Sequence, residues 1–148
     1  MRKLAILGSM LLLGAAPAEQ QDKTKTYAVI VNTKNRCTQT GSTVKATVKK
    51  LFLKQMTKWP DGTAAKPYGR KAGRPEQSAF VKDVLGMGDA ELARHWLKMR
   101  NMNGTTPPKG VSSDRMILKY VEKHGGAFGI VKLSEVKNSN SVKVLYRF

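Results

Sequence analysis

A short loop in the middle of the chain places three cations directly before an expected helix start. Arg70, Lys71 and Arg74 stand in the stretch YGRKAGRPEQSAF, residues 68–80, and Pro75 follows them. Proline is favoured at the first position of a helix, and the free backbone N–H groups and positive dipole end of a helix start attract anions. The loop therefore predicts an anion-binding site that includes Arg70, Lys71 and Arg74.

Two adjacent serines form a second candidate anion site later in the chain. Ser112 and Ser113 follow Lys109 and Gly110 and precede an expected helix, so their hydroxyl groups could add donors to those of the helix N-terminus. A serine in this position also caps a helix in the ordinary way, by accepting a hydrogen bond from a backbone N–H. Both interpretations of Ser112 and Ser113 stay open.

Residues that could carry out catalysis are few and are not grouped. Of the two histidines, His95 is expected inside a helix and His124 at a helix C-terminus, where the macrodipole favours a partly charged imidazole. Cys37 is the single cysteine, which excludes a disulfide within the chain. The sequence has no His/Cys/Asp cluster with metal-ligand spacing, no Gly-x-Ser-x-Gly elbow and no P-loop. We therefore expect neither an enzyme nor a bound metal or cofactor.

The net charge of the chain is +17 at neutral pH. An excess of this size favours polyanions, anionic membrane surfaces or small anions as partners, although a generally basic proteome explains it equally well. The densest set of cations lies along and just beyond the helix expected at residues 42–56, at Lys45, Lys49, Lys50, Lys54 and Lys58. We name this set the lysine ridge. It is an alternative binding surface, and a solvated helix face is its ordinary explanation.

The elements that must position these residues follow from hydrophobic periodicity and turn signals. Residues 26–32 form an apolar run rich in β-branched side chains, which is typical of a buried strand. Leu92 and Trp96 are expected on the buried side of their helix. Helices are predicted at 42–56, 75–86, 89–100 and 112–124, extended segments or strands at 63–69, 127–131 and 141–148, a turn at 59–62 and a loop at 101–110.

The predicted order is strand, helix, strand, three helices and two strands. This order favours an α/β fold in which helices flank a mostly buried sheet. We therefore predict a three-layer sandwich with a mixed sheet.

The first 18 residues are predicted to be a signal peptide. A short basic start leads into an apolar stretch, and the small residues that end at Ala18 are typical of a cleavage site. The predicted organisation is a signal peptide at 1–18, a polar leader at 19–25 and a single domain at 26–148. Loss of the signal peptide removes two cations and leaves a net charge of +15. The mature chain, without a transmembrane segment, is expected in the periplasm or outside the cell.

Three stretches resemble the PstS-type phosphate-binding proteins of bacterial ABC transporters. They are KKLFLKQMTKWPDGTAAKPYGR (49–70), FVKDVLGM (80–87) and GVSSDRMILKYVEKHGGAFGIV (110–131). In that family, a helix that ends in Phe-x-Gly-x-Ile/Met-x-x-Trp leads into a strand, a binding loop and a helix. A later Pro-Gly-Ala-Ile-Gly-Tyr-Val segment returns a strand to the sheet. The counterparts here are LFLKQMTKWPDG and EKHGGAFGIV.

This resemblance implies one lobe of a two-lobed, type II periplasmic-binding-protein-like fold. It also implies phosphate or a similar inorganic anion as the ligand, and an ABC transporter as a partner. When the sequences are aligned on Phe80, Arg70 falls on the binding arginine of the family, whereas Arg74, Pro75 and Glu76 stand where the family has Ser-Gly-Thr. By this resemblance, we expect half of the usual cleft to be missing unless another chain supplies it, and a second copy of the chain in a homodimer is one such source.

Two functions follow from these observations. The first is an exported, non-enzymatic, solute-binding-like protein that binds phosphate or another small anion weakly, or acts as an accessory to phosphate uptake. The alternative is a basic interaction module that docks an acidic envelope partner, such as an anionic lipid, a polymer or a membrane protein, through the lysine ridge. Nucleic acid is disfavoured because the chain is expected to be exported and because aromatic residues do not alternate with the ridge to stack bases.

Overall fold

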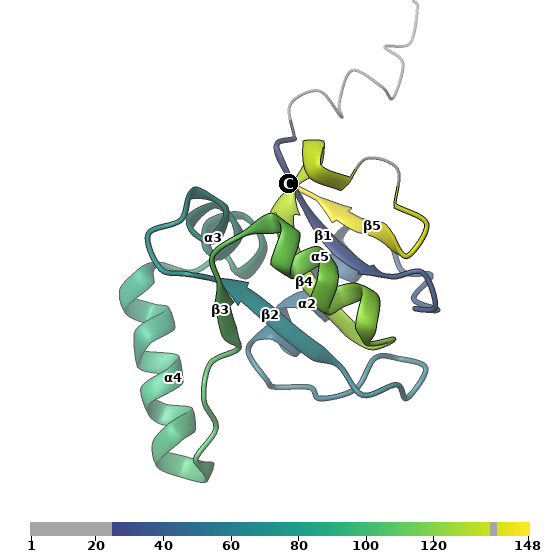
Figure 1. Cartoon of the computed structure of the whole chain (residues 1–148). Coiled ribbons are helices and arrows are strands. Elements are labelled where there is room, and N and C mark those ends of the chain that lie inside the picture. The colour runs from purple at the N-terminus through teal and green to yellow at the C-terminus, as the bar shows by residue number, and fades with distance from the viewer. Residues whose placement is uncertain (1–24, 137–138) are drawn as a thin grey trace, which may run out of the picture.

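The computed structural model describes residues 25–136 and 139–148 (Figure 1). The predicted signal peptide lies outside these residues. The described chain forms a five-stranded sheet with helices on both faces. The strands have the spatial order β3-β2-β4-β1-β5, with the bounds β1 Tyr27–Asn32, β2 Lys66–Arg70, β3 Lys109–Val111, β4 Ala127–Lys132 and β5 Val142–Arg147.

The sheet is mixed, as predicted. Strand β1 pairs antiparallel with β4 and β5, and β2 pairs parallel with β3 and β4. Successive side chains of a strand alternate between the two faces of a sheet, so Val29 and Val31 enter one hydrophobic core while Ala28 and Ile30 enter another. All four side chains are buried. Burial on both faces explains why the sequence of β1 is a continuous apolar run.

Helices cover both faces of the sheet and complete the three layers. Helix α2 (Gly41–Phe52), helix α3 (Pro75–Phe80) and the π-helical turn η1 (Val81–Leu85) pack on the first core, and helix α5 (Asp114–Lys123) packs on the second. Figure 1 shows α5 in front of the sheet and α2 behind it. The predicted three-layer α/β fold is thereby confirmed.

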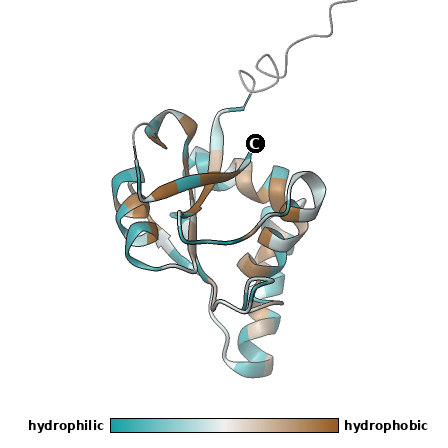
Figure 2. Cartoon of the chain, turned by 90° about the vertical axis from the view of Figure 1, so that its right-hand side faces the viewer, coloured by the Kyte–Doolittle hydropathy of each residue, from teal (hydrophilic) through white to brown (hydrophobic). Residues whose placement is uncertain are grey.

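Helix α4 (Asp89–Asn103) differs from the others because none of its residues is buried. Its last turns extend beyond the rest of the molecule in both views (Figures 1 and 2). Leu97 and Met102 are 50% and 69% exposed. Leu92 and Trp96 lie on the side of α4 that packs against the first core, as predicted, and both are half-buried there. The residues of α4 are not fully buried because this helix makes few contacts with any other element.

The helix predicted at 42–56 ends early, at Phe52. Lys54 then takes a left-handed conformation with φ of 57°. This turn leads the chain to Trp59, which is buried and whose Nε1 donates to the carbonyl oxygen of Gly126 at 2.9 Å. Burial of a large side chain stabilises the fold by about 3 kcal/mol, which outweighs the roughly 1–2 kcal/mol cost of one left-handed residue.

Strand β3 occupies the end of the segment that was predicted to be a loop, 101–110. It contains three residues, two of them lysine and glycine, so its sequence has no periodic signal of a strand. It forms because Gly110 pairs with Gly69 in the parallel ladder to β2. This pairing sets the start of α5 beside the end of β2, which decides the geometry of the candidate site.

Candidate anion-binding site

The two predicted anion loops meet at one end of the sheet. Strand β2 ends at Arg70 and strand β3 at Val111, and these residues are partners in the parallel ladder. Parallel neighbours place their carboxyl ends together, so the loop 71–74 lies beside Ser112 and Ser113 at the start of α5. The sequence predicted two separate sites, and the fold joins them.

Arg70 is enclosed by the protein instead of facing solvent. Its side chain is fully buried. Its guanidinium donates to three main-chain carbonyl oxygens, those of Val111 from Nε at 3.0 Å, Ile130 from Nη1 at 3.1 Å and Ser112 from Nη2 at 2.9 Å. Nη1 also forms an ion pair with the carboxylate of Asp114.

These contacts use four of the five N–H donors of the Arg70 guanidinium. They join the end of β2 to β4 and to the start of α5, and the rigid fork of a guanidinium suits such a junction. One N–H group of the guanidinium remains for an anion. The role of Arg70 as an anion ligand stays a prediction.

Arg74 also has a carboxylate partner within its own loop. Its Nε and Nη2 donate to Glu76 Oε2 and Oε1 at 3.3 and 3.2 Å, and the Glu76 side chain is fully buried while 41% of the Arg74 side chain is exposed. Burial acts to raise the pKa of Glu76. Its own backbone N–H, Arg74 and Arg70 together outweigh that effect and hold the pKa below its usual value.

At neutral pH, Glu76 therefore places a negative charge in the first turn of α3. A carboxylate at a helix start is stabilised by the dipole and by free N–H groups. In the family resemblance this position belongs to the hydroxyl-bearing part of the binding loop. The carboxylate of Glu76 stands at this position in the chain, as the alignment on Phe80 indicated.

Lys71 and Ser112 remain open to solvent at this end of the sheet. Both residues are exposed. In addition, no described residue accepts a hydrogen bond from the backbone N–H of Ala72 or Gly73. One cation, one hydroxyl group and two backbone donors are therefore available here to an anion from solution.

Ser113 has a structural role in the same region. It is the N-cap of α5, and its Oγ accepts a hydrogen bond from the backbone N–H of Met116 at 3.2 Å. Ser113 therefore acts as an ordinary helix cap, which is one of its two interpretations.

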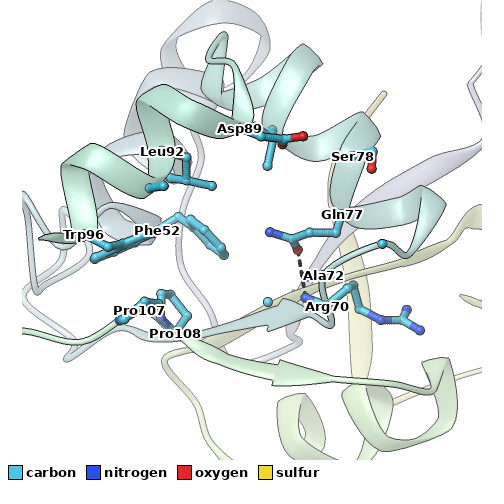
Figure 3. A pocket seen from close by; sticks show the side chains of 14 residues that line it. Phe52, Arg70, Ala72, Gln77, Ser78, Asp89, Leu92, Trp96, Pro107 and Pro108 are labelled. Carbon is cyan, nitrogen blue, oxygen red and sulfur yellow. Dashed lines mark hydrogen bonds between the residues drawn. The ribbon is translucent and has the colours of Figure 1, made fainter.

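An apolar groove of about 500 Å³ adjoins the loop (Figure 3). On one side, the Gln77 side-chain oxygen accepts the backbone N–H of Arg70 at 2.8 Å. The guanidinium of Arg70 points away from the groove in Figure 3, so the groove does not extend the cationic site. Its apolar lining comes from α2, α4 and the segment before β3, through Phe52, Leu92, Trp96, Pro107 and Pro108.

The lysine ridge is shorter than predicted. Its first three members lie on α2, whereas Lys54 and Lys58 follow the end of that helix at Phe52. The Nζ of Lys54 donates to the carbonyl oxygen of Thr106 at 2.8 Å. Helical spacing therefore does not place all five lysines on one face.

Within residues 25–136 and 139–148, no three His, Cys, Asp or Glu residues form a group that could hold a metal ion. His95 lies with Nε2 2.9 Å from the carbonyl oxygen of Leu53, and His124 is the exposed C-cap of α5. Cys37 is half-buried. No helix in these ranges is both long and apolar enough to span a membrane.

Sequence reasoning missed the two internal carboxylate partners of the loop. Glu76 stands two residues after Arg74, and this spacing was an available signal. Asp114 is 44 residues away from Arg70, so only the pairing of β2 with β3 brings the two together. No periodicity or motif could have indicated that contact.

No protein-family model and no curated protein matches the sequence. Solved structures match at low identity. An ABC-type phosphate transport receptor from Vibrio cholerae is 19% identical with a TM-score of 0.60, over 81% of this chain and 45% of that chain. A phosphate ABC transporter substrate-binding protein with bound phosphate from Clostridium perfringens is 18% identical with a TM-score of 0.60, over 81% and 44%. PstS from Borrelia burgdorferi is 11% identical with a TM-score of 0.57, over 78% and 43%.

The chain therefore spans less than half the length of the structures that it resembles. Likeness at such low identity concerns the fold, and it agrees with the fold expected from the quoted sequence stretches. The chain has the α/β fold of the PstS-type phosphate-binding proteins, over less than half of their length.

Proposed function

We propose that the chain is an exported, non-enzymatic, solute-binding-like protein that binds phosphate or another small anion weakly, or acts as an accessory to phosphate uptake. The observation that carries the proposal is the grouping of Lys71, Ser112 and the unbonded N–H groups of Ala72 and Gly73 where β2 and β3 end. The shared fold supports the choice of ligand, since the similar structures are described as phosphate transport proteins.

Binding is expected to be weak because both arginines of the loop already have carboxylate partners. A new anion would compete with Asp114 for Arg70 and with Glu76 for Arg74. Lys71 is then the main cation available, and an exposed charge pair contributes only about 0–1 kcal/mol. A dissociation constant of about a millimolar corresponds to roughly 4 kcal/mol of binding free energy, which is what a few such contacts supply.

A closed cleft would need a second half in addition to the described residues. A second copy of this chain, an ABC transporter or another envelope protein are the proposed sources. Closure would remove water from the anion, and charge-assisted hydrogen bonds strengthen in a dry site. If two copies close on one anion, phosphate should promote dimerisation.

Calorimetric titration of the purified protein with phosphate, at low and moderate salt, tests the proposal. We expect saturable heat that decreases with salt, and a several-fold loss of affinity in Lys71→Gln. Lys82→Gln, which removes an exposed lysine of η1 outside the loop, is the matched control and should have little effect. Absence of heat at both salt concentrations, or equal effects of the two substitutions, would contradict the proposal.

The net charge supports a second candidate, docking to an acidic envelope partner. The chain has 27 lysines and arginines against 10 acidic residues, a surplus of 17 positive charges. The part of the lysine ridge on α2 is the proposed contact surface. The amount of protein that sediments with vesicles of anionic lipid should decrease steeply as the salt concentration rises. Binding that does not depend on the salt concentration would exclude this candidate.

A further inference from the structure

A second cavity, of about 590 Å³, lies at the opposite end of β2 and β3 from the Arg70 loop. Its walls come from the starts of these two strands and from the end of α5, which crosses the front of the sheet between the two ends (Figure 1). We name it the lysine–tyrosine cavity. Its charged, imidazole and hydroxyl groups come from Lys54, Lys66, Lys109, Lys123, His124, Tyr68 and Tyr120.

Four ammonium groups surround this cavity, and no aspartate or glutamate is among the described residues that line it. The contacts of Lys66 and Lys109 are with an imidazole and a hydroxyl group. Lys66 Nζ lies 3.4 Å from His124 Nε2, and Lys109 Nζ donates to the Tyr120 hydroxyl at 3.3 Å. Like charges gathered in this way repel one another, and a bound anion would relieve that repulsion.

Two tyrosine rings hold the lysines in position. Tyr68 stacks on Tyr120 with ring centroids 4.8 Å apart and an angle of 8° between the planes. Lys66 Nζ lies 5.8 Å from the centre of the Tyr68 ring, and Lys109 Nζ lies 5.1 Å from that of Tyr120. Such cation–π contacts orient the ammonium groups, and ordering them in advance lowers the entropy lost on binding.

We propose that the lysine–tyrosine cavity binds a soluble multivalent phosphate, in which two or more phosphate groups are linked. Lysine is a frequent partner of phosphate as a point charge. Several lysines spread around a cavity of this size match several phosphate groups better than a single one. The site shares no residue with the Arg70 loop, so it stands apart from the weak single-anion site proposed above.

Two other polyanions fit the cavity less well. Nucleic-acid bases need free aromatic faces, whereas the two tyrosine rings contact each other and the ammonium groups. A membrane surface usually also takes apolar side chains. The exposed large apolar residues Leu97, Met102 and Met116 are not part of the cavity lining.

The ordinary explanation for part of the cluster is helix stability. Lys123 and His124 stand at the C-terminus of α5, where the dipole favours cations. Lys66 and Lys109 belong to strands and have no such reason to gather there. The test therefore concentrates on these two strand lysines.

Calorimetric titration with inorganic tripolyphosphate at physiological ionic strength measures the proposed binding. The double substitution Lys66→Gln with Lys109→Gln should weaken it about tenfold or more, since each lost contact charge counts about fivefold even at high dielectric constant. The matched control is Lys98→Gln with Lys82→Gln, which removes the same charge from two exposed lysines outside the cavity and outside the lysine ridge. We expect the control to change the affinity less than threefold. Tyr120→Phe, which keeps the stacked ring, should cause a smaller loss.

Several results would overturn the proposal. Equal weakening by the two double substitutions would mean that diffuse net charge, not the cavity, attracts the probe. Tripolyphosphate that binds no more tightly than orthophosphate would exclude a multivalent ligand. Binding to vesicles of phosphatidylglycerol that depends on Lys66 and Lys109, without tripolyphosphate binding, would assign the site to a lipid headgroup instead of a soluble phosphate. Unfolding midpoints of all variants serve as the control for folding.

Discussion

Arg70 joins β2, β4 and α5 through four hydrogen bonds of a fully buried guanidinium. Arg70→Ala should lower the free energy of unfolding by about 3–5 kcal/mol, because Asp114 and three carbonyl oxygens would lose their donor. Urea unfolding followed by tryptophan fluorescence measures this loss. Arg36→Ala removes an exposed arginine and should change stability by less than about 0.5 kcal/mol. An effect of Arg70→Ala as small as that of the control would mean that the guanidinium is free to bind a solute.

Glu76 gives the loop a stability that depends on pH. The pKa of its carboxyl is lower in the folded chain than the usual 4.5, so this group stabilises the fold above that pH. The contribution is lost as the pH falls through the folded pKa. Glu76→Gln should therefore cost about 1–3 kcal/mol at pH 7, and the difference from the original protein should shrink in acid.

Urea unfolding at neutral and acidic pH measures both parts of the Glu76 prediction. Glu91→Gln, which changes an exposed carboxylate of α4, is the control and should have little effect at either pH. The same gap between Glu76→Gln and the original protein at both pH values would contradict a charged Glu76 in the folded loop.

At the scale of elements, the turn before β4 and the segment before β2 approach each other closely at Gly126. A Cβ added there would stand 1.8 Å from the carbonyl oxygen of Ala64, so the backbone would have to move. Gly126→Ala should destabilise the fold by about 2–3 kcal/mol or more. The neighbouring Gly125→Ala meets no atom within 4 Å and is the control. Thermal unfolding compares the two, and equal midpoints would show that the approach is not tight.

The predictability of these elements depended on how local their signals were. Strand β1 and helix α5 were predicted because their apolar residues have strand or helix spacing over several residues. Strand β3 was missed because three residues carry no hydrophobic period. The inward side of α4 was predicted from its spacing, whereas no sequence signal shows how loosely that helix packs. In the candidate site, too, only the features with a local sequence signal were predicted. Ser113 at a helix start was predicted from local sequence, whereas the contact of Arg70 with Asp114 depends on two strands pairing far apart in the chain.

At the scale of the whole molecule, helix α5 connects two regions that attract anions by different means. Its first turn faces the Arg70 loop, where carboxylates of the chain already satisfy most of the positive charge. Its last turn faces the lysine–tyrosine cavity, where Lys66 and Lys109 contact an imidazole and a hydroxyl group. Four lysines of the fold therefore gather at the end of the sheet opposite the Arg70 loop.

The Arg70 junction also has a consequence for the order of folding. Its guanidinium reaches residues 41 to 60 positions further along the chain, and such contacts form only after several segments have come together. A contact absent from the folding transition state slows unfolding and leaves the folding rate almost unchanged. We therefore expect the junction to lower the unfolding rate, and so to lengthen the lifetime of the folded protein, more than it raises the folding rate.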